Sequence, residues 1–437
     1  METPIYTRLM DYHSQNRISF AMPGHKNMRG LACDVIKCDV TELSHTADLI
    51  GGDTATDRAN ELLRKFYNAK KSFILTGGST ACIKIMVSSA LKRGDTLLTM
   101  PDCHMSVINA CAVCGINMRM ENDILNTEIT PDIKAVLVTS PNYYGVIKNI
   151  KAISEKCHKN GVLLLVDEAH GAHFTGKYGL PDSSVECGAD MVCQSAHKTL
   201  GALTGAAYLH ICSDRVCENR VKRNIRVFHS SSPSYPIAAS ADIARAELKN
   251  SDYSGIVMLC NKFKKSIEGQ TKIKFLANDD PTRLVADFSE YDISGFLVLE
   301  ILCDKYGIDI EMADLCNIVL IVTPCNTAED FEALFGALSE IVSSLPYRKG
   351  NINLPAAPSI SGIFSPQDGF WGETERVDLA DAVGRISAQT VCMYPPGTAA
   401  VATGCKITLA AVEYILTLLD MGAYVSGISD GKIEVIL

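Results

Sequence analysis

Short apolar runs rich in strand-forming residues alternate with helical stretches between residues 70 and 215. The runs cover residues 72–76, 96–100, 135–139, 161–166, 191–194 and 206–210. Strands and helices that alternate at this spacing predict a mostly parallel sheet covered by helices on both faces. Ligands of such sheets bind outside the carboxyl ends of the strands. We therefore expect an α/β fold whose functional residues lie just after these runs.

Two of the runs lead into side chains that suit one cofactor. Residues 161–166 run directly into Asp167, and residues 191–194 are followed by a turn that holds Lys198. A lysine amine can form a Schiff base with pyridoxal phosphate, and a carboxylate can keep the pyridine nitrogen protonated so that the ring accepts electrons. Either residue alone would be an ordinary strand-end aspartate or turn lysine. Together they predict a pyridoxal phosphate site.

A glycine-rich loop and a histidine add to this prediction. The loop Thr76-Gly-Gly-Ser-Thr80 precedes a predicted helix over residues 81–91. Glycines let backbone N–H groups approach an anion, hydroxyls add donors, and a helix N-terminus favours negative charge. The same residues are also ordinary N-cap chemistry, so the phosphate-binding interpretation depends on Asp167 and Lys198. His104 follows the second run. It could stack on a pyridine ring, or it could be a loop histidine that only forms local hydrogen bonds.

Length, charge and cysteine content narrow the class of protein. The chain has 437 residues, enough for two or three domains. Its net charge of −9 argues against a nucleic-acid partner and is compatible with a cationic substrate. The N-terminal residues have no signal-peptide pattern, and no apolar run approaches the roughly 18 residues that span a bilayer. With 17 scattered cysteines, we expect a reduced, cytoplasmic protein without a membrane partner.

Two further patterns could be metal or redox sites. His170 and His173 could join Asp167 as metal ligands, but no other ligand motif completes such a site. Cys111 and Cys114 form a Cys-x-x-Cys pair, which is more typical of two small buried residues on one helix face when no second pair accompanies it. We expect no metal.

Several motifs resemble one known family. Asp167-Glu-Ala-His-Gly-Ala-His173 and Gln194-Ser-Ala-His-Lys-Thr-Leu-Gly-Ala-Leu203 closely resemble motifs of the ornithine/lysine/arginine decarboxylases, which are fold-type I pyridoxal phosphate enzymes. Further matches extend the resemblance over nearly the whole chain: Ser19-Phe-Ala-Met-Pro-Gly-His-Lys26, Asp39-Val-Thr-Glu-Leu43, Thr139-Ser-Pro-Asn-Tyr-Tyr-Gly145, Ser231-Ser-Pro-Ser-Tyr-Pro236 and Tyr394-Pro-Pro-Gly397. The chain is similar to the short form, without the N-terminal wing domain of larger members.

The resemblance implies an organisation in three units. An N-terminal arm and a large cofactor-binding domain with an aspartate-aminotransferase-like, mostly parallel sheet would cover residues 1–250. A small aminotransferase-like α/β domain would cover residues 251–346. A C-terminal decarboxylase-family α+β domain would cover residues 347–437 and begin with a linker at residues 347–358 that is rich in Pro, Asn and Gly.

The resemblance also implies roles for single residues. Lys198 would be the Schiff-base lysine, Asp167 the partner of the pyridine nitrogen, and His104 the stacking residue. Lys198 or His197 would supply a proton during catalysis. The remaining cofactor-binding residues would be Gly78, Ser79, Thr80, Ala169, His170, Ser195, His197 and Ser232. Ser232 would reach a neighbouring subunit's cofactor, because the family's active sites lie at the interface of a homodimer or larger homo-oligomer.

The expected reaction is decarboxylation of an amino acid, with departures that concern the substrate. The family's usual Arg-Asn-x-His-Lys-Ser appears here as Pro101-Asp-Cys-His-Met-Ser106, and Cys405 stands where the family has a glutamate. A basic amino acid, with arginine preferred over lysine or ornithine, would yield an amine for polyamine biosynthesis. Glu311 and Asp314 are candidates for the acidic group that receives it. The alternatives are a non-basic substrate, cleavage of a different Cα bond, or a non-catalytic regulatory paralogue.

Overall fold

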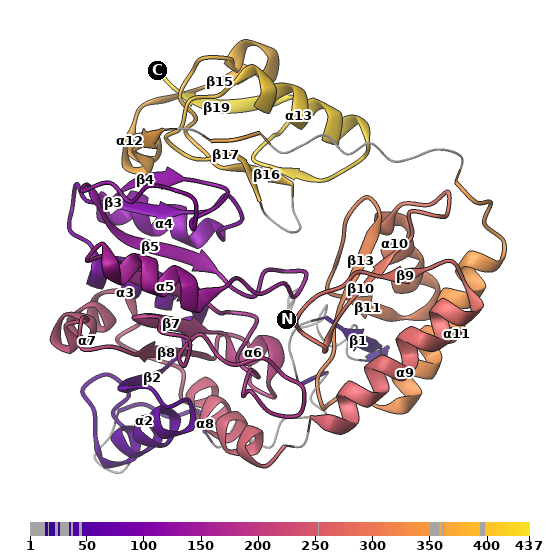
Figure 1. Cartoon of the computed structure of the whole chain (residues 1–437), viewed down its shortest axis with the longest axis horizontal. Coiled ribbons are helices and arrows are strands. Elements are labelled where there is room, and N and C mark those ends of the chain that lie inside the picture. Colours follow the sequence, from indigo (N-terminus) through magenta and orange to yellow (C-terminus); the bar gives the residue numbers. More distant parts are fainter. Residues whose placement is uncertain are drawn as a thin grey trace, which may run out of the picture.

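The large unit is built on an eight-stranded sheet (Figure 1). The computed structural model describes residues 14–15, 17–21, 25–26, 35, 38–42, 46–251, 253–348, 358–360, 362–393 and 398–437. Within them the strands lie in the order β14 (Ile363–Phe364), β4 (Asn117–Met120), β3 (Thr96–Thr99), β5 (Ile133–Thr139), β6 (Leu163–Asp167), β7 (Met191–Gln194), β8 (Ala207–Ile211) and β2 (Lys71–Leu75).

The centre of this sheet is parallel, as the sequence predicts, but one expected strand runs the other way. Strands β4, β3, β5, β6 and β7 are mutually parallel, whereas β8 is antiparallel to both β7 and β2. Residues 195–206 connect β7 to β8 and hold only the short helix α6 (Ala196–Thr199). A parallel neighbour would need a longer crossover, so the chain reverses direction instead. Strand β4 was not among the strands predicted from the sequence.

Helices cover both faces of the sheet because its central strands are apolar on both sides. Val136 and Val138 of β5 enter one hydrophobic core, which also contains residues of α2 (Thr54–Phe66), α5 (Ile150–Lys159) and α8 (Tyr235–Asn250). Ala135 and Leu137 enter the opposite core with residues of α3 (Gly78–Ala90), α4 (Met105–Cys114) and α7 (Glu218–Phe228). Successive side chains of a strand point to opposite faces, so a continuous apolar run is buried on both.

A smaller unit lies beside the large sheet (Figure 1). Its antiparallel sheet has the order β12 (Met312–Ala313), β13 (Asn317–Ile321), β10 (Arg283–Asp287) and β9 (Lys274–Phe275). Helices α9 (Ser254–Gln270), α10 (Gly295–Tyr306) and α11 (Ala328–Ser343) belong to this unit. Strand β1 (Ile18–Phe20), from the start of the chain, pairs in parallel with β11 (Ile308–Ile310) and so joins the N-terminal arm to the small unit.

The C-terminal part packs against the edge of the large sheet. Its strands form a pair, β15 (Thr374–Asp378) with β19 (Lys432–Ile436), and a three-stranded sheet of β17 (Ala399–Val401), β16 (Val391–Met393) and β18 (Val425–Ser426). Strand β14 pairs with β4 of the large sheet, and α12 (Pro366–Trp371) lies against α4. Helix α13 (Leu409–Asp420) and the 3₁₀ turn η1 (Leu379–Ala382) complete this part.

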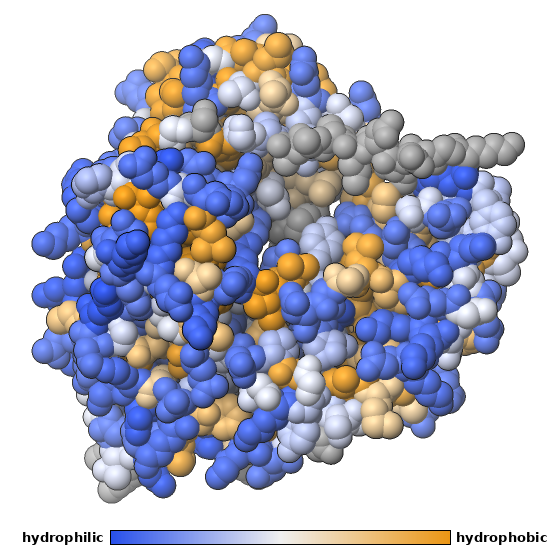
Figure 2. Space-filling model, in the orientation of Figure 1, coloured by the Kyte–Doolittle hydropathy of each residue, from blue (hydrophilic) through white to orange (hydrophobic). Residues whose placement is uncertain are grey.

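Hydrophilic side chains cover most of the face shown in Figure 2, with hydrophobic residues gathered over the C-terminal part. No helix among the described residues combines the length and the apolar composition needed to cross a membrane.

Residues 394–397 and most of the expected linker at 347–358 lie outside the described residues, as do residues 22–24 and 43 of two family motifs. The division at residues 250 and 346 stays a prediction.

Candidate active site

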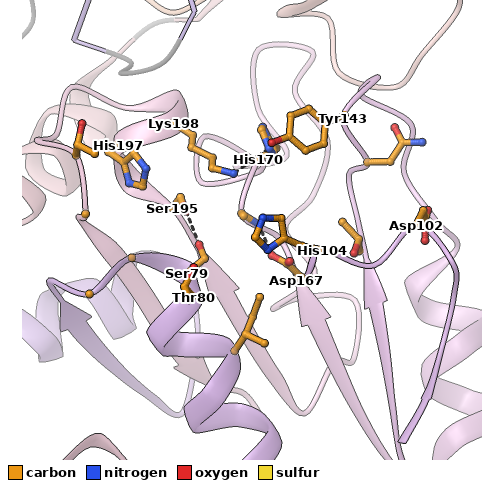
Figure 3. A pocket seen from close by; sticks show the side chains of 18 of the residues that line it. Ser79, Thr80, Asp102, His104, Tyr143, Asp167, His170, Ser195, His197 and Lys198 are labelled. Carbon is orange, nitrogen blue, oxygen red and sulfur yellow. Dashed lines mark hydrogen bonds between the residues drawn. The ribbon is translucent and has the colours of Figure 1, made fainter. Parts of the chain in front are cut away.

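A pocket of about 370 Å³ opens at the carboxyl ends of the parallel strands (Figure 3). It brings together nearly all the side chains that the sequence analysis singled out: Gly78, Ser79, Thr80, His104, Asp167, Ala169, His170, Ser195, His197 and Lys198. The volume lies in the range of small-molecule sites. Most of these side chains therefore meet where we expected them, just after the carboxyl ends of the strands. The roles of the residues stay predictions.

The N-terminus of α3 forms one end of the pocket. Its N-cap, Gly77, contributes no side-chain cap, and a Cβ added there would lie 2.8 Å from the Cβ of Ala81. Gly78 has a φ of +68°, a conformation that glycine adopts without strain. The hydroxyl of Ser79 hydrogen-bonds that of Ser195 from the end of β7. Uncapped amides, a positive helix end and hydroxyl donors suit a phosphate group.

Asp167 is a buried carboxylate at the end of β6. Its side chain is 2% exposed, and Oδ1 accepts a hydrogen bond from the Ala169 amide at 3.1 Å. No cation within the described residues forms an ion pair with this carboxylate. A buried charge of this kind needs a positive partner, and a protonated pyridine nitrogen would provide one. The site therefore fits pyridoxal phosphate, by the chemistry of its donors and by this unpaired carboxylate.

Lys198 faces this carboxylate from α6 in the same pocket. Its Nζ lies 3.0 Å from Nε2 of His170 and 5.7 Å from the centre of the Tyr143 ring. Burial lowers the pKa of the Lys198 amine, and the charge of Asp167 opposes this shift only in part. A lysine with a lowered pKa has a larger share of the neutral, nucleophilic amine.

The hydrogen bonds of His104 and His197 determine which ring nitrogen carries the proton. The Ser106 amide donates to Nδ1 of His104 at 3.1 Å, so the proton of the neutral ring is on Nε2. Nδ1 of His197 lies 3.0 Å from the Ala206 carbonyl oxygen, which can only accept, so that proton is on Nδ1. Burial lowers the pKa of both rings, which keeps them neutral near pH 7.

The opposite end of the pocket carries a second carboxylate. Asp102 follows β3 and lies across the pocket from Lys198 (Figure 3). Its Oδ2 lies 2.7 Å from Nζ of Lys148, whereas Oδ1 is buried without a hydrogen-bond partner among the described residues. Thr398, just before β17, lines the same pocket. The C-terminal part of the chain thus helps to enclose the site.

Several other residues that line the pocket belong to a motif noted in the sequence but were given no role in the site. Asn142, Tyr143 and Tyr144 lie in the loop after β5, and Thr139 is the last residue of that strand. They follow the same strand-end rule as Asp167, so this signal was present. Asp102 was noted only as a departure from the family, although it lies two residues after the end of an apolar run.

Other expected site residues lie elsewhere. Ser232 lines a second pocket of about 340 Å³ that shares Gly77 and Thr80 with the first but does not include Lys198. His173, considered above as a metal ligand, does not line the pocket, and its Nε2 lies 3.2 Å from Oδ1 of Asp280. Cys405 is 4% exposed in the core of the C-terminal part, where its thiol accepts the Ala402 amide at 3.2 Å.

The two acidic candidates for the substrate site do not line the pocket. Asp314 accepts a hydrogen bond from the Tyr144 hydroxyl at 2.7 Å and is also bonded to the side chain of Asn317. The negative charge of Glu311 raises the pKa values of Lys26, Lys198 and Arg283 against the opposing effect of burial.

Comparisons with known proteins agree with this geometry. Residues 3–285 match the family model described as the Orn/Lys/Arg decarboxylase major domain, and residues 365–430 match the model of its C-terminal domain. An arginine decarboxylase of Bacillus subtilis is 29% identical over 100% of this chain and 97% of its own length. An uncharacterized protein of the same organism, YaaO, is 32% identical over 98% of this chain and 96% of its own.

A solved structure shares the fold. The constitutive lysine decarboxylase of Escherichia coli superposes with a TM-score of 0.74 at 20% identity, over 100% of this chain and 82% of that one.

Proposed function

Because this chain belongs to the Orn/Lys/Arg decarboxylase family, we propose that it catalyses the pyridoxal phosphate-dependent decarboxylation of a basic amino acid, with arginine as the preferred substrate. The products are CO₂ and the corresponding amine, which is agmatine for arginine. One observation carries the proposal: a single pocket holds the amine of Lys198, the buried carboxylate of Asp167 and the uncapped N-terminus of α3.

Each part of the pocket would hold one part of the cofactor. The amides at the start of α3 and the hydroxyls of Ser79, Thr80 and Ser195 would bind the phosphate. Asp167 would hold the positive charge of the pyridine nitrogen, and His104 would lie against the ring. When bound, pyridoxal phosphate supplies an aldehyde that bonds to amines and a ring that accepts the electron pair of the broken Cα–carboxylate bond.

The histidine tautomers favour Lys198 over His197 as the group that returns a proton to Cα. His197 donates its Nδ1 proton to the Ala206 carbonyl and is neutral near pH 7, so its Nε2 has no proton to give. Lys198 Nζ can take up a proton and release it again. His104 keeps Nε2–H as a fixed donor, since the Ser106 amide occupies Nδ1.

Asp102 supports a cationic substrate. Its Oδ1 is buried without a hydrogen-bond partner among the described residues, at the end of the pocket opposite Lys198 (Figure 3). The family usually has an uncharged Asn here, so this chain has gained a carboxylate inside the pocket while its Cys405 lies in the C-terminal core. A guanidinium or ammonium group could bind Oδ1 beside Lys148, with a charge-assisted hydrogen bond.

We further propose that the chain acts as a cytoplasmic homodimer that supplies polyamine biosynthesis. Residues 231–236 would complete the partner's site, because Ser232 lines a second pocket beside Gly77 rather than its own chain's main pocket. This arrangement agrees with the interface position that the family resemblance implies.

The test measures CO₂ release from carboxyl-labelled amino acids by the purified full chain with pyridoxal phosphate. We expect release from arginine, with weaker release from lysine and ornithine. Borohydride reduction should fix the cofactor on Lys198. Activity confined to an acidic or apolar amino acid would overturn the basic-substrate proposal. A chain that takes up no cofactor, or that carries the reduced adduct on another residue, would overturn the enzymatic proposal as a whole.

A further inference from the structure

Arg283, His170 and Lys198 form a hydrogen-bonded chain that links the small unit to the pocket. Nη2 of Arg283, on β10, lies 3.1 Å from Nδ1 of His170, and Nε2 of the same ring lies 3.0 Å from Nζ of Lys198. His170 is 3% exposed and Arg283 is 2% exposed. His170 lines the pocket (Figure 3), whereas Arg283 does not.

The chemistry of the three groups fixes the direction of these hydrogen bonds. A guanidinium has only donors, so Nδ1 of His170 must accept and cannot carry a proton. A neutral imidazole then has its one proton on Nε2, which donates toward Lys198. Nζ of Lys198 accepts that bond only through a lone pair, which an ammonium group lacks. The geometry therefore requires a neutral amine.

We propose that Arg283 is a positioning residue for Lys198: it fixes His170 in the Nε2–H tautomer, and His170 in turn holds the Lys198 amine neutral and ready to bond to an aldehyde. In that reaction the amine nitrogen bonds to the aldehyde carbon, and the aldehyde oxygen leaves as water with the two amine protons. Only the neutral amine has the electron pair for this bond. The inference deepens, and rests on, the proposed role of Lys198.

The other groups around Lys198 have opposing effects on whether its amine is protonated. The charges of Asp167 and Glu311 favour the ammonium form, as does the face of the Tyr143 ring. Burial and the positive charge of Arg283 favour the neutral amine. Without Arg283, the ring of His170 could move its proton to Nδ1 and accept a bond from an ammonium group. Arg283 is the group that prevents this exchange.

The groups around His170 agree with a neutral ring. Burial lowers its pKa well below the usual range, and the positive charges of Lys198 and Arg283 act in the same direction, with smaller effects from His104 and His197. The Tyr143 ring packs against it, with centroids 4.5 Å apart. These contacts hold the imidazole plane in place between its two partners.

The first test follows capture of pyridoxal phosphate by the full-length chain, freed of cofactor, as a function of pH. Capture is read from the absorbance of the bound cofactor and from the borohydride-reduced adduct on Lys198. In Arg283→Met we expect the midpoint of the capture-rate profile to move up by about one pH unit, which is about tenfold slower capture below the midpoint. Arg283→Lys keeps a donor and should stay near wild type. Arg245→Met, which removes another buried arginine, is the matched control.

A double-mutant cycle separates the tautomer effect from the charge of Arg283. In a His170→Ala background, Arg283→Met should shift the midpoint by clearly less than in the wild type, because the intermediary is gone. Equal shifts in both backgrounds would mean that Arg283 acts by charge alone, and the proposal would be wrong.

The second test measures the wild-type chain itself and uses one substitution only to assign signals. The ¹⁵N NMR shifts of the histidine ring nitrogens in the wild-type chain report the tautomer directly, with the His170 signals identified by their loss in His170→Gln. We expect an unprotonated Nδ1 and a protonated Nε2. A proton on Nδ1, or on both nitrogens, would overturn the inference. Wild-type protein that captures no cofactor at Lys198 but shows this tautomer would instead contradict the proposed function alone.

Discussion

Asp102 and Lys148 form an ion pair at the end of the pocket opposite Lys198, with 2.7 Å between Oδ2 and Nζ. They come from different connections of the sheet: Asp102 follows β3, and Lys148 precedes α5. The C-terminal part reaches the same place, because the Ala399 amide donates to the Pro101 carbonyl at 3.4 Å. The pair leaves the second oxygen of Asp102 buried without a partner among the described residues. We propose that this oxygen receives the cationic end of the substrate.

Asp102→Asn should weaken substrate binding more than it slows catalysis. Loss of a hydrogen bond to a charged group costs about 1.5–3 kcal/mol, so we expect KM for arginine to rise about 10- to 100-fold with a smaller change in kcat. Lys148→Met should have the opposite effect and lower KM, because Asp102 then loses its competing cation. Steady-state kinetics on both variants check this. A change of KM in the same direction for both would contradict the proposed role of Asp102.

Lys198→Ala should abolish covalent capture of the cofactor and reduce decarboxylation by about 10²–10⁴-fold, the range typical of a lost proton-transfer group. Pyridoxal phosphate should still bind through the α3 end of the pocket. Equilibrium dialysis measures the bound cofactor, and mass spectrometry locates the reduced adduct. Lys177→Ala, which removes an exposed lysine, is the control and should behave as wild type. Wild-type rates in Lys198→Ala would rule out its assigned role.

Asp280 should stabilise the fold at neutral pH, and this contribution to the free energy of unfolding should be lost in acid. Burial raises the pKa of this carboxyl, but His173, Arg283 and the Thr282 hydroxyl outweigh burial and lower it to about 2. A carboxyl with a lowered pKa stabilises the fold above its unfolded pKa near 3.8 and loses that effect as pH falls toward 2. The shift corresponds to about 2 kcal/mol. Urea midpoints between pH 3 and 6 should therefore fall less steeply in Asp280→Asn than in wild type, and parallel profiles would refute this.

Lys26 should destabilise the fold at neutral pH. Burial lowers the pKa of its amine to about 7, and the negative charge of Glu311 opposes this only in part. The unfolded chain stays protonated up to its ordinary pKa of 10.5, so it binds more protons than the folded chain between these values, and stability rises with pH across this window.

Lys26→Met should therefore raise the free energy of unfolding at pH 6 by several kcal/mol, at about 1.4 kcal/mol per pKa unit. The difference between the two chains should shrink toward pH 10. Thermal or urea unfolding of both chains over this range gives the comparison. A destabilised variant at pH 6 would show that the amine is instead stabilised by its surroundings, such as the Ala21 carbonyl that it contacts at 2.6 Å.

Much of the fold follows from local sequence patterns. The apolar run at residues 191–194 coincides with β7, and the other predicted runs differ from their strands by a few residues at either end. Strand β4 was missed because Asn117-Met-Arg-Met120 is short and alternates polar with apolar residues. The direction of β8 could not be read from its composition, which suits either orientation.

The site was predictable to the extent that it follows one geometric rule. Asp167 and Thr139 are partners in the register of β6 and β5, so residues after these strands had to meet. The contact of Arg283 with His170 could not be predicted, because the two residues are 113 positions apart in the chain and Arg283 belongs to another sheet. The burial of Cys405 and the separate pocket of Ser232 likewise depend on how distant segments pack.

The amino-acid sequence by itself determined the order of strands and helices and placed Asp167, Lys198 and a glycine-rich loop at strand ends, because periodicity and turn chemistry act over a few residues. Only the tertiary structure decided which hydrogen bonds the histidine rings make, that burial lowers the pKa of the Lys198 amine, and which carboxylate lines the far end of the pocket. These properties depend on hydrogen-bond partners and burial. Both are set by contacts between segments that are far apart in the chain.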